Sequence, residues 1–119
     1  MITSRFTENG WLQIVIQPDN ATDDIQSFQA RVTNSELKHF ISCLDETLRR
    51  ILWIESNYHT DTEAKEIYNH ADVVRRGSFV VISYRSIYRV HLIFRSSSML
   101  LSFGELEGLL SSLKALLAS

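Results

Sequence analysis

The sequence lacks the features that would place the protein outside the cytosol. It contains one cysteine, Cys43, so no internal disulfide can form and a reducing compartment is favoured. No apolar run approaches the roughly 20 residues of a membrane-spanning helix. The N-terminus also lacks the apolar core of a signal peptide. We therefore expect a cytoplasmic protein that makes no contact with a membrane.

Signatures of catalysis are lacking as well. The glycines form no phosphate-binding loop, because Gly104 and Gly108 frame the acidic run Glu-Leu-Glu. The sequence identifies no histidine partner for Cys43, which would be needed for a nucleophilic role. The serines at 96–98 have no nucleophile-elbow motif around them. We expect no catalytic residue and no enzymatic activity.

A metal site is equally unsupported. Glu63, Glu66 and His70 could share one helix face as half of a carboxylate-histidine site, but the second half is missing. We expect no metal and no cofactor.

Size and charge set further limits. At 119 residues, the chain is long enough for one domain that buries roughly two-thirds of its unfolded surface. The formal net charge of -2 excludes a strongly basic nucleic-acid-binding protein. We therefore expect a single domain over residues 1–119.

Three segments in the second half of the chain have the pattern of strands. Residues 79–84 are apolar on both faces, as in a central strand. Residues 88–95 alternate with a period of two, which places Tyr88 on the buried face. The serines at 96–98 predict a turn, and a short strand is expected at 99–101.

The first 32 residues predict three more strands, at 2–6, 11–17 and 25–32. Asn9-Gly10 is the strongest hairpin signal in the sequence and joins the first two. In the second strand, Trp11 points away from the face that carries Leu12, Ile14 and Ile16, so we expect it on the surface of the sheet.

Capping boxes mark the starts of two amphipathic helices. Ser102 and Glu105 have the spacing at which each side chain bonds the backbone of the other, and Thr33 and Glu36 repeat it. Helical spacing predicts the buried stripe of the later helix at Leu106, Leu109, Leu110, Leu113, Leu116 and Leu117. The earlier helix is expected to run to about Ser56, with a buried stripe of Leu37, Phe40, Ile41, Leu44, Leu48 and Ile51.

A middle helix is expected over residues 60–76, with Arg75 and Arg76 in its last turn and Gly77 as its stop. The fold class is then α+β, a mainly antiparallel sheet built from two strand-strand-strand-helix units with an intervening helix, and with the helices on one face. An offset of 69 residues aligns the two capping boxes. Either residues 1–56 and 77–119 form a pseudo-repeat, or two capped helices share leucines by their common pattern.

This order of elements resembles, in topology alone, the PUR-repeat and Whirly families of single-stranded nucleic-acid binders. No motif residue accompanies the resemblance, and it assigns no site.

Positive charge is concentrated in one block of the chain. Residues 73–104 contain five arginines and no acidic residue, a segregation that can mark an anion-facing surface. The candidate binding residues are Arg89, His91 and Arg95, expected together on the outer face of one strand, and Tyr84 and Arg85, of which one or the other is expected nearby on the partner strand. Three interpretations stay open: a solvated face whose arginines pair with distant carboxylates, a protein interface, or a surface for single-stranded nucleic acid.

Trp53 completes the candidate binding residues. With Leu52 and Ile54 it forms three consecutive apolar residues, more than one buried stripe needs. Either the middle helix covers them, or they contact another chain, for example in a homodimer.

The lack of a catalytic constellation favours a small soluble binding module whose partner is another protein. An inhibitor, an immunity-type protein, an adaptor or a chaperone would fit this description. The alternative is binding of single-stranded nucleic acid through the arginine-rich sheet face.

Overall fold

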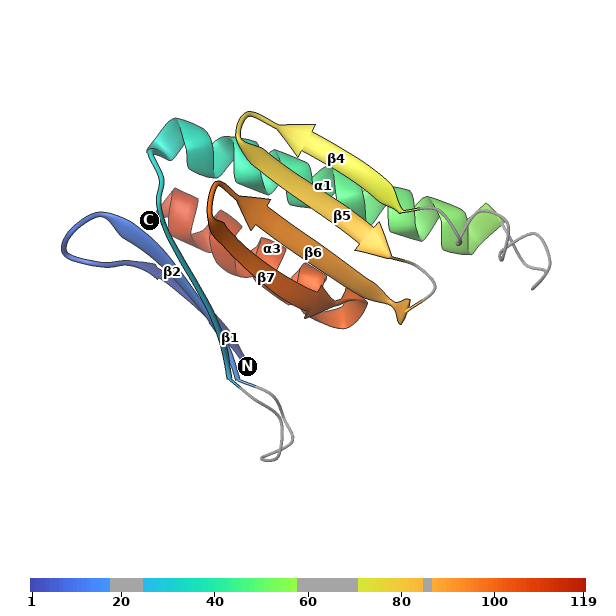
Figure 1. Cartoon of the computed structure of the whole chain (residues 1–119), viewed down its shortest axis with the longest axis horizontal. Coiled ribbons are helices and arrows are strands. Elements are labelled where there is room, and N and C mark those ends of the chain that lie inside the picture. Colours follow the sequence, from blue (N-terminus) through green and yellow to red (C-terminus); the bar gives the residue numbers. More distant parts are fainter. Residues whose placement is uncertain (18–24, 58–70, 85–86) are drawn as a thin grey trace.

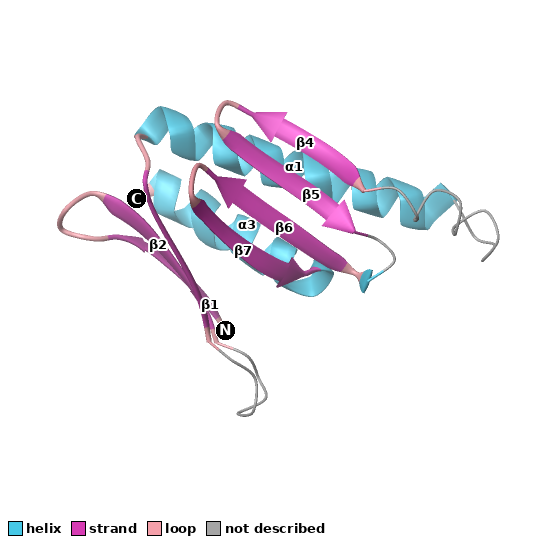
Figure 2. Cartoon of the chain, in the orientation of Figure 1, coloured by secondary structure: helices cyan, strands magenta, loops and turns pink. Residues whose placement is uncertain are grey.

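The computed structural model of the chain describes residues 1–17, 25–57, 71–84 and 87–119. In order, these residues form β1 (Ile2–Phe6), β2 (Trp11–Ile16), β3 (Gln26–Arg31), α1 (Asn34–Asn57), β4 (Asp72–Arg76), β5 (Phe79–Tyr84), β6 (Arg89–Phe94), β7 (Ser97–Ser102) and α3 (Phe103–Ala118). The fold is α+β with antiparallel sheets, which confirms the predicted fold class (Figure 2).

The described strands form two antiparallel sheets, β1-β2-β3 and β4-β5-β6-β7. Both helices lie behind the four-stranded sheet, and the three-stranded sheet stands beside β7 (Figure 1). At this seam, Ser97 Oγ donates to Gln29 O at 2.7 Å, and Leu100 N donates to Gln26 Oε1 at 3.4 Å. Side chains, rather than a backbone ladder, therefore join the two sheets.

Buried side chains from both sheets and both helices form one continuous core. Its centre is a row of stacked rings that runs from β3 through α1 to β5 and β6. The ring of Phe40 lies 6.2 Å from Phe28 and 4.4 Å from Phe79, and Phe79 lies 4.1 Å from Phe94. Of the predicted leucine stripe of α3, the fully buried members are Leu106, Leu109 and Leu113.

Both predicted capping boxes are confirmed. Thr33 N donates to Glu36 Oε1 at 3.0 Å, and Glu36 N donates to Thr33 Oγ1 at 3.1 Å. The equivalent distances between Ser102 and Glu105 are 2.8 Å and 3.2 Å. Each box pairs backbone donors that the first turn of a helix leaves without partners. The helix α1 follows three antiparallel strands and α3 follows four, and the pseudo-repeat stays a prediction.

The hairpin expected at Asn9-Gly10 is present, but its loop has three residues. Thr7 N donates to Trp11 O at 2.8 Å, and Gly10 N donates to Thr7 O at 3.0 Å. Gly10 has a φ of 79°, whereas Asn9 is not left-handed. A turn followed by one left-handed residue is the common form of a three-residue hairpin loop.

The middle helix predicted over residues 60–76 is wrong at its C-terminal end. Residues 72–76 form β4, and residues 60–70 lie outside the described part of the chain. In β4, Val74 is buried between the exposed Val73 and Arg75, which is the period of a strand. Gly77 therefore stops no helix and instead joins β4 to β5.

The boundaries of β6 and β7 also differ from the prediction. Tyr88 has a φ of 53°, so β6 begins one residue later, and the Tyr88 side chain is exposed instead of buried. Arg95 has a φ of 54° and forms the next turn with Ser96. As a result, Ser97 and Ser98 begin β7 and do not belong to the turn.

Candidate interaction face

The four-stranded sheet has its helices on one side only in the described part of the molecule (Figure 1). In β5, Phe79, Val81 and Ser83 point toward the helices and are buried. The intervening side chains therefore point to the opposite side, as alternation along a strand requires. This opposite side is called the outer face.

The strand register places the outward side chains of the outer face in rows that cross the sheet. The first row, from β4 to β7, contains Val73, Ile82, His91 and Leu100. The second row contains Arg75, Val80, Ile93 and Ser98. Tyr84 and Arg89 form the next row on β5 and β6.

Aliphatic side chains occupy the middle of the outer face. Val73 and Leu100, on the two outermost strands, are 40% and 41% exposed. Between them, Val80, Ile82 and Ile93 are half-buried by their neighbours. Val73 is directly opposite Ile82, and Val80 is directly opposite Ile93, at about 5.5 Å or less. Leu100 is opposite His91 and lies diagonally next to Ile93, at about 7–8 Å, so the five aliphatic side chains form one patch together with His91. A solvated face of an antiparallel sheet normally carries polar residues at such positions.

Among the described residues, the charged side chains at the border of the patch are all positive. Arg75 and Arg89 are exposed, and no carboxylate of the described residues lies within ion-pair distance of either guanidinium. Arg89 Nη1 donates to the neighbouring Tyr88 O at 3.2 Å. Asp72 of β4 has the inward orientation and accepts from Arg50 Nη1 of α1 at 2.9 Å. The outer face thus combines an aliphatic centre with unpaired cations.

The structure brings three of the predicted site residues together and places Arg95 and Trp53 elsewhere. Tyr84 and Arg89 lie directly opposite each other, and His91 follows Arg89 on the same side of β6. Arg95 instead lies in the turn after β6. Its guanidinium is 3.3 Å from the carboxylate of Glu36 and 4.8 Å from the ring centre of Phe94.

The remaining two predicted residues are Arg85 and Trp53. Arg85 lies outside the described residues. Trp53 lies on α1, in the helix layer on the opposite side of the sheet, and is 57% exposed beside Leu52, which is 51% exposed. These two side chains form a separate apolar surface.

Sequence reasoning missed the aliphatic patch. Residues 79–84 are apolar on both faces, but this pattern predicts a central strand and does not by itself indicate an exposed apolar face. Val73 and Arg75 were assigned to a helix. The register across four strands is what brings Leu100 into line with Val73.

The outer side of the three-stranded sheet is different in character. Trp11 is exposed there, as predicted, and the Arg31 guanidinium lies 5.7 Å from its ring centre. Arg5 Nε donates to Gln13 Oε1 at 2.8 Å. The guanidinium groups of Arg5 and Arg31 are therefore both engaged by side chains of their own sheet.

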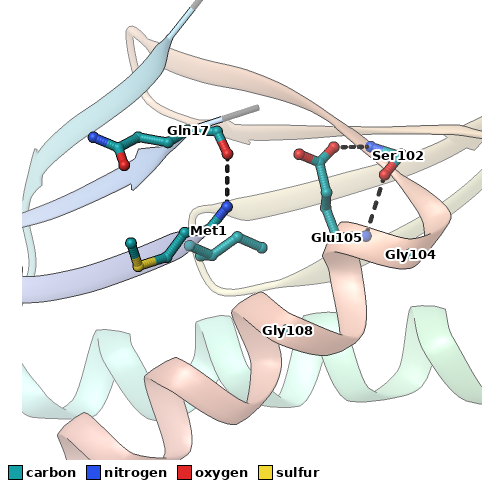
Figure 3. A pocket seen from close by; sticks show the side chains of 7 residues that line it. Met1, Gln17, Ser102, Gly104, Glu105 and Gly108 are labelled. Atoms are coloured by element: carbon teal, nitrogen blue, oxygen red, sulfur yellow. Dashed lines mark hydrogen bonds between the residues drawn. The ribbon is translucent and has the colours of Figure 1, made fainter. Parts of the chain in front are cut away.

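A hollow of ≈ 480 Å³ lies between the start of β1 and the first turns of α3. Figure 3 shows that its polar groups are already engaged: the Met1 ammonium donates to Gln17 O at 2.6 Å, and Glu105 holds its capping box with Ser102. A methyl group at Gly108 would lie 3.3 Å from Ile2 Cδ1. The hollow thus offers no unpartnered charge to a ligand.

The described residues contain no group of three side chains suited to a metal ion, and Glu63, Glu66 and His70 lie outside them. Neither described helix is long and apolar enough to cross a membrane. Comparisons with models of protein families, with curated proteins and with solved structures found no match to the chain.

Proposed function

We propose that the protein is a non-enzymatic binding module that acts by protein–protein interaction through its outer face. The observation that carries this proposal is the aliphatic patch of two exposed and three half-buried side chains bordered by Arg75, Arg89 and Tyr84. Protein interfaces have an apolar centre and a polar rim, and arginine and tyrosine are enriched at their energetic hot spots.

Binding of single-stranded nucleic acid is supported less well by the same face. Proteins that bind single strands stack successive bases on aromatic rings. The described rows of the outer face contain two such rings, Tyr84 and His91, and the other side chains at their centre are aliphatic. Phosphates would gain from Arg75 and Arg89, but the bases would find little to stack on.

A pair of matched variants tests the proposal. Leu100→Asp places a charge in the aliphatic patch, and Leu52→Asp places the same charge on the similarly exposed surface of α1. Each tagged variant is expressed in the native cell, and its co-purifying proteins are quantified by mass spectrometry against the parent. Thermal melting of each purified variant shows whether it is folded.

We expect Leu100→Asp to lose a partner that both the parent and Leu52→Asp retain, with all three folded. Retention of every partner by Leu100→Asp would remove the outer face as the interface. Loss confined to Leu52→Asp would move the interface to the surface that includes Trp53.

Two sequence-based predictions accompany this proposal. Cytoplasmic location stays a prediction. So does a homodimer, for which the exposed Leu52 and Trp53 are the candidate contact. Sedimentation of the parent and of Leu52→Asp at high micromolar concentration measures whether such a dimer forms.

A further inference from the structure

We infer that the outer face receives a single amphipathic helix with acidic flanks, supplied by the partner protein. This inference rests on the proposed function and adds the kind of partner surface that fits. Its support comes from the size of the patch, the state of the strand edges and the placement of the arginines.

The patch is too small for a second folded surface on its own. Four adjacent strands span about 14 Å, and three rows of outward residues span about 13 Å. The area is therefore about 200 Å² in projection, whereas a stable interface buries about 800 Å² on each partner. A helix is about 10 Å wide and rises about 1.5 Å per residue, so roughly 10 residues would cover the patch.

The backbone of the ligand also favours a helix over an extended strand. A strand laid across the face of a sheet would leave its own N–H and C=O groups without partners, whereas a helix pairs them internally. Addition of a strand at an edge is opposed by contacts already present. Cys43 Sγ donates to Val74 O of β4 at 3.2 Å, and β7 is bridged to β3 by the bond from Ser97 Oγ.

The two border arginines set the charge and the spacing of the ligand. Arg75 lies on β4 and Arg89 on β6, two strands and two rows apart, so their Cα atoms are separated by about 16 Å. Carboxylates about 11 residues apart on a helix span that distance.

A second copy of this chain fits poorly at the same place. In a two-fold symmetric contact the same surface meets itself. The described residues of the outer face include arginines and no carboxylate, so such a contact would bring like charges together. An acidic ligand would instead meet opposite charges at both ends of the patch.

Three synthetic peptides of 15 residues serve as probes. The first has leucines at helical spacing flanked by glutamates, the second has lysines in place of the glutamates, and the third is a scrambled version of the first. Binding to the full chain is measured by fluorescence anisotropy, and the contacted residues are identified from chemical-shift changes in ¹⁵N-labelled protein.

The acidic amphipathic peptide is expected to bind most tightly and to shift the amide signals of β4 to β7. Arg75→Glu combined with Arg89→Glu should weaken this peptide roughly tenfold and should favour the lysine peptide. A matched control, Arg5→Glu with Arg31→Glu, makes the same change of charge on the other sheet and should leave the affinity unchanged. Both double variants alter exposed side chains, and their melting temperatures verify folding.

Other outcomes would overturn the inference. One is equal binding of the acidic and scrambled peptides, and another is chemical-shift changes confined to other elements. A third is a concentration-dependent change of the outer-face signals in the parent protein without peptide, which would assign the outer face to contact with a second copy. If the peptides fail while Leu100→Asp still loses a native partner, the helix is wrong and the protein-binding proposal stands. A single-stranded oligonucleotide that shifts the same residues, with affinity falling steeply in salt, would overturn both.

Discussion

Gly77 combines a left-handed backbone with a close approach to another element. Its φ is 58°, and a Cβ atom built on it would lie 2.8 Å from Nδ1 of His39 on α1. Gly10 also has a positive φ, of 79°, but a Cβ atom there would have no neighbour within 4 Å. Substitutions at the two glycines therefore distinguish the cost of backbone strain alone from the cost of strain combined with a steric contact.

Gly10→Ala is expected to lower the free energy of unfolding by about 1–2 kcal/mol, because alanine is strained at positive φ. Gly77→Ala should cost more, because its methyl group must also displace the His39 ring. Adding His39→Ala to Gly77→Ala should remove only that excess. Urea denaturation of the variants measures each cost. Equal losses in the free energy of unfolding for Gly10→Ala and Gly77→Ala would show that the contact with His39 adds no cost.

Cys43 is buried on α1 against β4. Burial raises the pKa of its thiol from 9.0 to about 11, and the nearby Arg76 guanidinium opposes this shift only in part. Because the thiolate is the reactive form, the native thiol should resist alkylation until the protein unfolds.

The same shift predicts a loss of stability in alkali. Above pH 9 the unfolded thiol loses its proton while the native thiol keeps it, so the unfolded state binds fewer protons and the free energy of unfolding falls. The slope is at most about 1.4 kcal/mol per pH unit and ends near pH 11. Cys43→Ala should lack this contribution, because every other titrating group is shared. Parallel curves for parent and variant between pH 9 and 11 would contradict the prediction.

Buried leucines pack each helix against the core, and a capping box lies at the N-terminus of each helix. Leu44 of α1 and Leu109 of α3 are fully buried. Leu44→Ala and Leu109→Ala should each cost about 2–5 kcal/mol through lost burial and the cavity left behind. Ser102→Ala should cost about 1 kcal/mol, because Glu105 N loses its acceptor. Denaturant midpoints measure all three, and Leu116→Ala at a half-buried position is the control expected to cost least.

Elements with strong local signals were predictable from the sequence. The first strand matches the prediction at both ends, and α1 and α3 begin where the capping boxes placed them. β4 was missed because Val74 suits the spacing of a helix as well as that of a strand over so few residues. Its pairing with β5 decides between the two, and pairing is a tertiary contact.

The candidate site was only partly predictable for the same reason. Tyr84, Arg89 and His91 follow from alternation within two strands. Arg95 was misplaced because a left-handed non-glycine residue has no sequence signal, and because its partner, Glu36, is 59 residues away. The aliphatic patch depends on the register of four strands, which no single segment reveals.

At the scale of the whole molecule, charge differs between the two sides of the four-stranded sheet. The helix side carries ion pairs, with Arg49 paired to Asp45 and Glu46, and Lys114 also paired to Asp45. A hydrogen bond from Arg50 holds the pKa of the Glu46 carboxyl below its usual value. On the outer face, by contrast, Arg75 and Arg89 pair with no carboxylate in the part of the chain that the structure describes. An acidic partner would therefore be oriented toward the outer face before contact.

The seam between β3 and β7 has a consequence for how the protein opens. Leu100 N faces the seam and donates to Gln26 Oε1 at 3.4 Å. The amide of Leu101 points instead toward β6, with which β7 forms an antiparallel pair. The amide proton of Leu100 should therefore exchange with deuterium through local opening of the seam, whereas that of Leu101 should exchange only when β6 and β7 separate. Gln26→Ala should speed exchange at Leu100 and leave Leu101 unchanged, as measured by NMR. The seam between the two sheets would then open to water while each sheet stays intact. Amide protons within a sheet would stay protected from exchange during this opening.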